Sequence, residues 1–147
     1  MRNLVYSKRF EEAEQLLAAE PDLLQKTDSM GETVLHFLDV ENDIEGVEWL
    51  HTHGASLNTA NRFGTPMVFE VAAAGHQAMV LWLAQQDIDF SVSDGRNRSL
   101  FEYLRRGTEE AKPEWPTYDR MQARKKRAIE MEQFLEKNLP DVFKGAT

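Results

Sequence analysis

The chain has 147 residues, with a hydrophobic fraction of 41% and an aromatic fraction of 10%, which is enough to fold around a core. It contains no cysteine, which excludes disulfides and thiolate chemistry and weakens any case for structural zinc. Its 25 acidic and 17 basic residues give a net charge of −8. This charge argues against general nucleic-acid binding, which depends on Lys and Arg meeting phosphates, and favours a basic partner.

Neither a membrane span nor a secretory signal is expected. No window approaches the roughly 18 consecutive apolar residues that a transmembrane helix needs. Residues 1–9, MRNLVYSKR, lack the apolar run of a signal peptide. We therefore predict no membrane association and a cytoplasmic location.

The start of the chain, residues 1–27, predicts two short helices. The first is expected near Asn3–Ser7 and the second from Phe10 onward, followed by an extended segment that begins at Pro21-Asp22. The second helix would turn one apolar side inward, made of Ala13, Leu16 and Leu17.

Turn, glycine and apolar positions recur together along the chain at an offset of 33 residues. Asp28, Asn61 and Asp94 share one position of this repeat, and Gly31 corresponds to Gly64. The apolar positions that recur are Leu16-Leu17, Trp49-Leu50 and Trp82-Leu83; Leu24, Leu57 and Phe90; Val47 and Val80; Leu35 and Val68. An offset shared by all three kinds of residue indicates an internal repeat.

Each repeat predicts a short helix, a second helix and an extended hairpin. In residues 28–60, Thr33 can cap the first helix, Asn42-Asp43 can form the turn, and Gly54 can stop the second helix. In residues 61–93 we expect Pro66 in the first helical turn and Asp87 in the left-handed conformation. The tip of the hairpin is expected at Gly64, and Leu50, Val80 and Leu83 are expected in the core.

The repeat resembles an ankyrin repeat. Residues 28–36, DSMGETVLH, and 53–58, HGASLN, match that family's pattern, which has a period of about 33 residues and a Thr-Pro-Leu-His-x-Ala signature. Gly64-Thr-Pro66 and residues 72–76, AAAGH, match it again. Val34 replaces the usual proline, Asp39 an alanine, and Gly46 an apolar residue. The resemblance implies a single-domain all-α solenoid of about four helix-turn-helix units, near residues 1–27, 28–60, 61–93 and 94–147, with short hairpin tips.

The last unit differs from the others. Leu100, Phe101 and Leu104 predict its first helix, and a loop near residues 108–117 with Pro113 and Pro116 interrupts it. A long capping helix should follow, near residues 118–137. Its apolar set is Met121, Ala128, Ile129, Met131, Phe134 and Leu135.

The sequence predicts no catalytic, cofactor or metal site. The resemblance implies that His36 and His76 are structural and bond backbone between neighbouring loops. His51 and His53 are two residues apart, so they do not share a helix face, and we expect both on the solvated surface. The runs of carboxylates lie on predicted outer helices, and the chain has no glycine-rich phosphate loop. We therefore expect a protein that is not an enzyme and needs no cofactor.

The resemblance also implies a binding surface made of the hairpin tips and the exposed side of the first helices. Met30 and Phe63 would be exposed apolar tips, and the arginines would form a basic half of this surface. The partner-binding residues predicted are Met30, Glu32, Val40, Glu41, Arg62, Phe63, Thr65, Arg96, Arg98 and Arg106, with Ser7, Lys8, Ser29, Ala73 and Ala74 on the same face.

The leading hypothesis is a protein–protein interaction module that is monomeric when free and takes no small-molecule substrate. Its partner could be a toxin or enzyme, which would make the chain an inhibitor or immunity protein. Two alternatives remain: an enzyme on an ankyrin scaffold, and a nucleic-acid binder that uses the basic closing helix. That helix carries Arg120, Arg124, Lys125, Lys126 and Arg127, although the glutamates that follow favour a salt-bridged, solvated face.

Overall fold

The computed structural model describes residues 1–107 and 112–146, and this part of the chain is all-α, without a β-strand. One isolated bridge joins Ala60 and Pro66. The helices are α1 (Arg2–Tyr6), α2 (Phe10–Ala19), α3 (Val34–Val40), α4 (Ile44–Thr52), α5 (Met67–Ala73), α6 (Gln77–Ala84), α7 (Leu100–Arg105), α8 (Tyr118–Asn138) and α9 (Pro140–Ala146), with a 3-10 turn, η1, at Pro21–Leu24.

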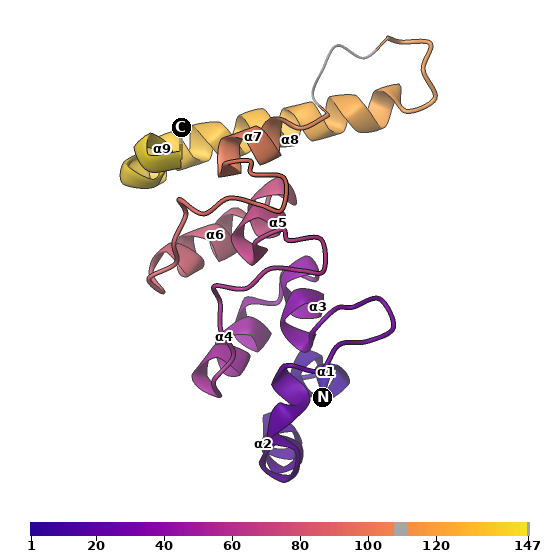
Figure 1. Ribbon diagram of the computed structural model, residues 1–147, viewed down its shortest axis with the longest axis vertical. Coiled ribbons are helices and arrows are strands. Elements are labelled where there is room, and N and C mark those ends of the chain that lie inside the picture. Colours follow the sequence, from indigo (N-terminus) through magenta and orange to yellow (C-terminus); the bar gives the residue numbers. More distant parts are fainter. Residues whose placement is uncertain (108–111, 147) are drawn as a thin grey trace.

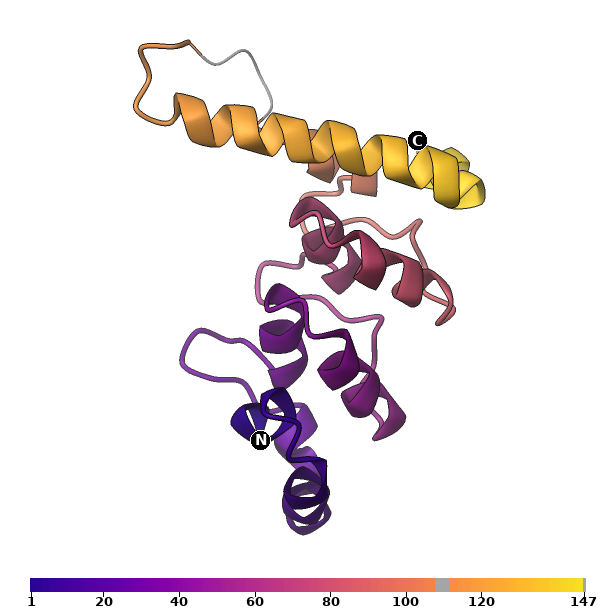
Figure 2. The ribbon, with the colours of Figure 1, turned by 180° about the vertical axis from the view of Figure 1, so that it is seen from behind.

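The helices stack in two rows along the long axis of the molecule (Figure 1). One row consists of α1, α3, α5 and α7, in which each helix packs on the next, and the partners α2, α4 and α6 form the other row. The long helix α8 lies across the end of the stack, and the view from behind shows the same arrangement (Figure 2). We call α1, α3, α5 and α7 the inner helices and the row of their partners the outer helices.

Buried side chains from α1 to α8 form one contiguous hydrophobic core. Leu50, Val80 and Leu83, which were predicted to be core residues, are fully buried, so that prediction is confirmed. Leu100, Phe101 and Leu104 of the predicted last unit are buried as well. The apolar pattern was therefore sufficient to locate the buried sides of these helices.

Side-chain caps and left-handed residues set the helix ends. The Thr33 hydroxyl accepts a hydrogen bond from the His36 amide at 3.3 Å, as predicted. Asp43 caps α4 in the same way, by accepting from the Gly46 amide at 3.1 Å. Gly54 (φ 103°) and Asp87 (φ 62°) both adopt the left-handed conformation after their helices, which confirms the role predicted for Asp87.

The structure departs from the sequence prediction in several places. Residues 21–24 form a 3-10 turn instead of an extended segment, because Pro21 fits the first position of a helical turn. Pro66 was expected in the first turn of its helix, but it is the N-cap residue of α5, which begins at Met67. Helix α8 confirms the predicted closing helix, but Ile129 is exposed on it, and α9 was not predicted.

The predicted interruption near 108–117 lies partly outside the described residues, which exclude 108–111; residues 112–117 are not helical. In the part of the chain that the structure describes, no helix is both long and apolar enough to cross a membrane.

Candidate interaction surface

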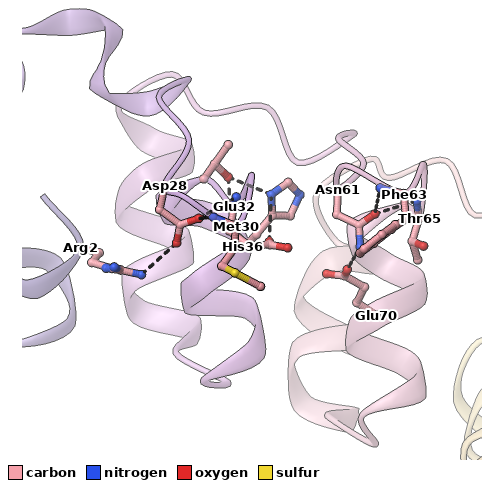
Figure 3. Close-up of polar contacts among 10 residues, drawn as sticks. Arg2, Asp28, Met30, Glu32, His36, Asn61, Phe63, Thr65 and Glu70 are labelled. Atoms are coloured by element: carbon pink, nitrogen blue, oxygen red, sulfur yellow. Dashed lines mark hydrogen bonds and ion pairs between the residues drawn. The ribbon is translucent and has the colours of Figure 1, made fainter.

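Three turns with the same internal hydrogen bonds line one edge of the stack. The Asp28 carboxylate accepts from the amides of Met30 (2.8 Å) and Glu32 (3.0 Å). The Asn61 side chain accepts in the same way from the amides of Phe63 (2.9 Å) and Thr65 (3.1 Å), and Figure 3 shows the two turns side by side.

The third turn repeats this geometry. Asp94 accepts from the amides of Arg96 (3.0 Å) and Arg98 (2.8 Å). A short polar side chain that satisfies two amides fixes a tight turn without help from distant residues. The amide donations from Glu32 and Met30 also hold the pKa of Asp28 below its ordinary value.

The turns are packed against one another. The Gly95 amide donates to the Gly64 carbonyl at 3.0 Å. A Cβ added at Gly95 would lie 2.6 Å from the Phe63 carbonyl oxygen, and one at Gly64 would lie 2.9 Å from the Gly95 Cα. Gly64 also has a φ of 77°, so glycine is required there for two reasons. The second and third tips are therefore held at a fixed spacing, and the first contacts the second through the Arg62 side chain beside Gly31.

Each turn presents one large side chain to solvent at its outermost position. Met30 is 56% exposed and Phe63 is 68% exposed, and Arg96 occupies the same position of the third turn and is also exposed. The Arg62 guanidinium lies over the Phe63 ring at 4.5 Å, a favourable cation–π geometry. We call Met30, Arg62, Phe63 and Arg96 the tip row.

Two of the predicted binding residues are not available at the tips. Thr65 is buried, with only 8% of its surface exposed, because its backbone closes the second turn against α5. Arg98 donates to Asp94 through Nε and pairs with it through Nη2, both at 2.8 Å, so its charge is neutralised within the molecule. The predicted basic half of the surface is thereby reduced at the tips to Arg62 and Arg96.

The other predicted residues lie in the first turn and at the ends of the inner helices. Val40 and Glu41 are exposed at the end of α3, with Val40 63% exposed. Glu32 is half-buried, and one of its carboxylate oxygens lies 3.8 Å from His36 Nδ1. Ser7, Ser29 and Ala74 are exposed and Ala73 is half-buried. The Lys8 ammonium is engaged by Asp43.

A cleft of about 300 Å³ opens where α8 overhangs the ends of the inner helices. It brings together the predicted residue Arg106 with Arg124 and Arg127 of the basic helix. Its lining residues are Val40, Glu70, Ala73, Ala74, Tyr103, Leu104, Arg106, Arg124, Arg127 and Ala128. We call this feature the arginine cleft.

Arg106 is the most constrained of the three arginines. Its guanidinium stacks over the Tyr103 ring at 3.5 Å and donates to the Tyr103 carbonyl at 2.7 Å. Partial burial and the neighbouring charges of Arg124 and Arg98 hold the pKa of Arg106 below its usual range. The cleft thus concentrates positive charge on a chain whose net charge is −8.

The basic helix is divided by this arrangement. Half-buried Arg124 and exposed Arg127 line the cleft. Lys125 and Lys126 are exposed and do not line it, and Lys126 lies 3.9 Å from Glu130. The salt-bridged face expected from the sequence is therefore present for Lys126 and does not extend to the two arginines of the cleft.

Buried Asp39 and half-buried Glu70, which lines the cleft, form a pair of acidic groups that the sequence analysis missed. Burial, with the nearby charges of Glu70 and Glu32, raises the pKa of Asp39 to about 9. Burial also raises the pKa of Glu70 to about 7, although Asn61 donates a hydrogen bond to it (Figure 3). Asp39 is 1% exposed. The available signal was the position of Asp39, where the resembled pattern has alanine, on the buried side of a helix.

The histidines differ from expectation. His36 is buried, but its ring Nδ1 bonds the Thr33 hydroxyl at 3.0 Å within the same unit, and among the described residues no partner reaches its Nε2 or that of His76. His51 and His53 were expected on the solvated surface, and this is wrong. Both are half-buried. The His53 ring stacks on Trp49, with ring centroids 3.9 Å apart, because residues 49 and 53 are four positions apart and share one side of the helix.

A scan of protein-family models and a search of curated proteins each found no match for this chain. Within residues 1–107 and 112–146, no cluster of three or more His, Cys, Asp or Glu side chains has an arrangement that could hold a metal ion. Function must therefore be argued from the surface itself.

Proposed function

We propose that this protein is a protein-binding module built as an ankyrin-type stack, and that it holds its partner on the tip row and the adjoining inner helices. The observation that carries this proposal is the set of three equivalent turns, which present Met30, Phe63 and Arg96 in a row, with the second and third turns bonded to each other. Large apolar groups exposed on a rigid frame, beside arginine, are typical of interface hot spots. Rigid presentation also lowers the entropic cost of binding.

The spacing of the helices supports the ankyrin part of the proposal. Helices α3, α5 and α7 begin at Val34, Met67 and Leu100, 33 residues apart, and α4 and α6 begin at Ile44 and Gln77 with the same offset. Three turns with one hydrogen-bond pattern recur at that period as well. An array of such units exposes one long side made by tips and inner helices, and repeat proteins use that side for binding.

An inhibitor or immunity protein is the narrower form of this proposal. In this form the protein acts only by binding its partner. The sequence predicts no catalytic constellation, which favours such a role. A partner recovered from the native organism and found to be a toxin or enzyme, with an activity that this chain suppresses, would establish this form. A partner whose activity is unaffected would reject it.

The proposal is tested by a double substitution in the tip row. Phe63→Ala with Arg96→Ala should weaken the partner by at least about 2 kcal/mol, or some thirtyfold in affinity. Folding should be nearly unchanged, since both side chains are exposed. Isothermal titration against the purified partner measures the affinity, and thermal unfolding checks the fold.

The matched control lies on α8. Reversing Lys125 and Lys126 to Glu changes two exposed cations away from the tips, and should alter protein binding little. If the tip variant binds normally while the α8 variant loses affinity, the binding surface lies on α8 and a nucleic-acid partner becomes the better explanation.

One observation favours an enzyme as the second candidate. Glu70 lines the arginine cleft and has a pKa of about 7, a value suited to a general base. Glu70→Gln removes the titrating group while keeping its shape. Unchanged cellular function in this variant would reject the enzyme, and loss of function with normal partner binding would support it.

A further inference from the structure

The arginine cleft is a separate feature from the tip row. Three elements form it: α5 supplies Glu70 and Ala73 with its C-cap residue Ala74, the C-cap residue of α7 is Arg106, and α8 supplies Arg124 and Arg127. Figure 1 shows α8 crossing the end of the stack and extending past α7, which makes this overhang possible. The small side chains of α5 leave room for a ligand side chain to enter.

The positive charge of the cleft has no ion-pair partner among the residues that the structure describes. Arg106, Arg124 and Arg127 form no ion pair with any carboxylate in residues 1–107 and 112–146. By contrast, Arg98 and Arg105 pair with Asp94 and Glu132 at 2.8 Å. Among the lining residues Glu70 carries the carboxyl group, and burial raises its pKa to about 7, so near neutral pH it is only partly ionised and offsets less than one of the three positive charges.

Two of the three guanidinium groups, those of Arg106 and Arg124, lie close against neighbouring atoms. Arg106 is stacked on Tyr103. Arg124 lies against the backbone at Gly107, where an added Cβ would be 2.5 Å from its Nη1, whereas Arg127 is exposed. Guanidinium groups fixed in this way lose less rotamer entropy when they bind a planar anion through parallel hydrogen bonds.

The size of the cleft and the charge of the chain restrict the ligand. A volume of about 300 Å³ accommodates one or two side chains, not a macromolecular strand. The net charge of −8 repels a polyanion such as nucleic acid at long range. A single acidic group on a protein that is neutral or basic overall meets both conditions. The exposed Val40 at the rim would contact apolar atoms around that group.

We propose that the arginine cleft binds a glutamate or aspartate side chain of the partner protein, in ion pairs with Arg106, Arg124 and Arg127. The inference rests on the proposed function, since it takes the ligand to be part of a protein partner. It adds a second contact, polar and specific for a carboxylate, to the apolar contact at the tip row.

The test uses the full chain and two synthetic peptides that differ in one group. Ac-Ala-Ala-Glu-Ala-Ala-NH2 and its Gln counterpart are titrated into nitrogen-15-labelled protein, and the arginine Nε–H resonances are followed. The Glu peptide should shift the Arg106, Arg124 and Arg127 resonances saturably. The Gln peptide should bind at least about tenfold more weakly, because the charge-assisted bonds are lost.

Matched variants of α8 sharpen the test. Arg124→Gln with Arg127→Gln should weaken the Glu peptide at least about tenfold, whereas Lys125→Gln with Lys126→Gln, which removes the same charge from the same helix, should not. Arg124→Lys with Arg127→Lys keeps the charge and loses the planar fork, so it should also weaken binding. If circular dichroism shows that the Gln variant does not fold, this Lys variant is used for the test instead.

Several outcomes would overturn the assignment. Equal binding of the Glu and Gln peptides, or equal shifts at Arg62 and Arg96, would show that the cleft does not select a carboxylate. Tighter binding of inorganic phosphate or of a short oligothymidylate through the same resonances would replace the carboxylate by a phosphate ligand. The tip variant Phe63→Ala with Arg96→Ala should bind the peptide normally. If the peptide binds but no tip substitution changes the affinity for the partner, the proposed function is rejected while carboxylate binding by the cleft is supported.

Discussion

The tip row and the arginine cleft are built in different ways. Each tip is closed by hydrogen bonds between residues two and four positions apart in sequence, as in the bonds from Met30 and Glu32 to Asp28. The cleft depends on α8 packing against α5 and α7, which brings Arg124 next to Arg106 across a long connection. Local bonding makes the tips independent of the end of the chain, whereas the cleft exists only while α8 is docked.

The largest effect that separates the two regions should come from the core beneath α8. Leu135 is fully buried on α8, and Leu135→Ala should lower the free energy of unfolding by about 2–5 kcal/mol. Near 25 °C, peptide binding in the cleft should weaken while the tip amides keep their NMR shifts. Chemical denaturation and NMR measure both.

The matching substitution for Leu135→Ala is in the core between the outer and inner helices. Leu83→Ala should cost a similar 2–5 kcal/mol, because Leu83 of α6 is equally buried. Its effects should spread to the tips, since α6 supports α5 and the turns beside it. Identical patterns of shift changes in the two variants would contradict the independence of tips and cleft.

An intermediate effect should come from the packing between tips. A Cβ at Gly95 would lie 2.6 Å from the Phe63 carbonyl oxygen, a backbone atom that cannot turn away. Gly95→Ala should therefore destabilise the protein by about 1–3 kcal/mol and displace the Phe63 tip, with weaker partner binding. Thermal unfolding and titration of the partner measure these changes.

Gly145→Ala is the control for that substitution, because a Cβ at Gly145 meets no atom within 4 Å. It should leave partner binding unchanged and stability equal or slightly higher. Normal binding by Gly95→Ala would show that the spacing of the tips does not matter for recognition.

The sequence predicted the tips because local residues determine them, and it missed the cleft because the cleft depends on how distant helices pack. Asp28, Asn61 and Asp94 recur at one offset, and such a residue stabilises a turn wherever it stands, so sequence was sufficient for the turns. It also gave the buried sides of the helices and the extent of α8 to within one residue at its C-terminus. It could not show which face of α8 would meet α5, because Arg124 to Arg127 form one basic run in sequence.

The errors on single residues have the same origin. Arg98 looked like a surface cation, but its own turn residue, Asp94, neutralises it. His53 looked solvated until its stacking on Trp49 was known. The departure of Asp39 from the alanine of the resembled pattern was visible, and only the fold connected it with Glu70 on the next inner helix.

The smallest effect concerns the acidic pair between the two regions, and it depends on pH. Burial and neighbouring carboxylates raise the pKa of Asp39 to about 9 in the folded state, above the ordinary aspartate value of 3.8. The folded protein therefore holds a proton that the unfolded chain has released, and this contribution to stability is complete below about pH 4 and is lost progressively as the pH rises towards 9. Asp39→Asn keeps the neutral shape at every pH, so at pH 8 it should raise the free energy of unfolding by about 1–2 kcal/mol and flatten its pH dependence.

Denaturation in urea at a series of pH values measures both the free energy of unfolding and its pH dependence, with Asp89→Asn as the control. The pKa of Asp89 is lowered by its bonds to Ser91, so this control should not gain stability at pH 8. A wild-type stability that rises between pH 5 and 8 and falls on Asp39→Asn would show that Asp39 is ionised in the fold, and that the cleft beside it is less positive than we infer.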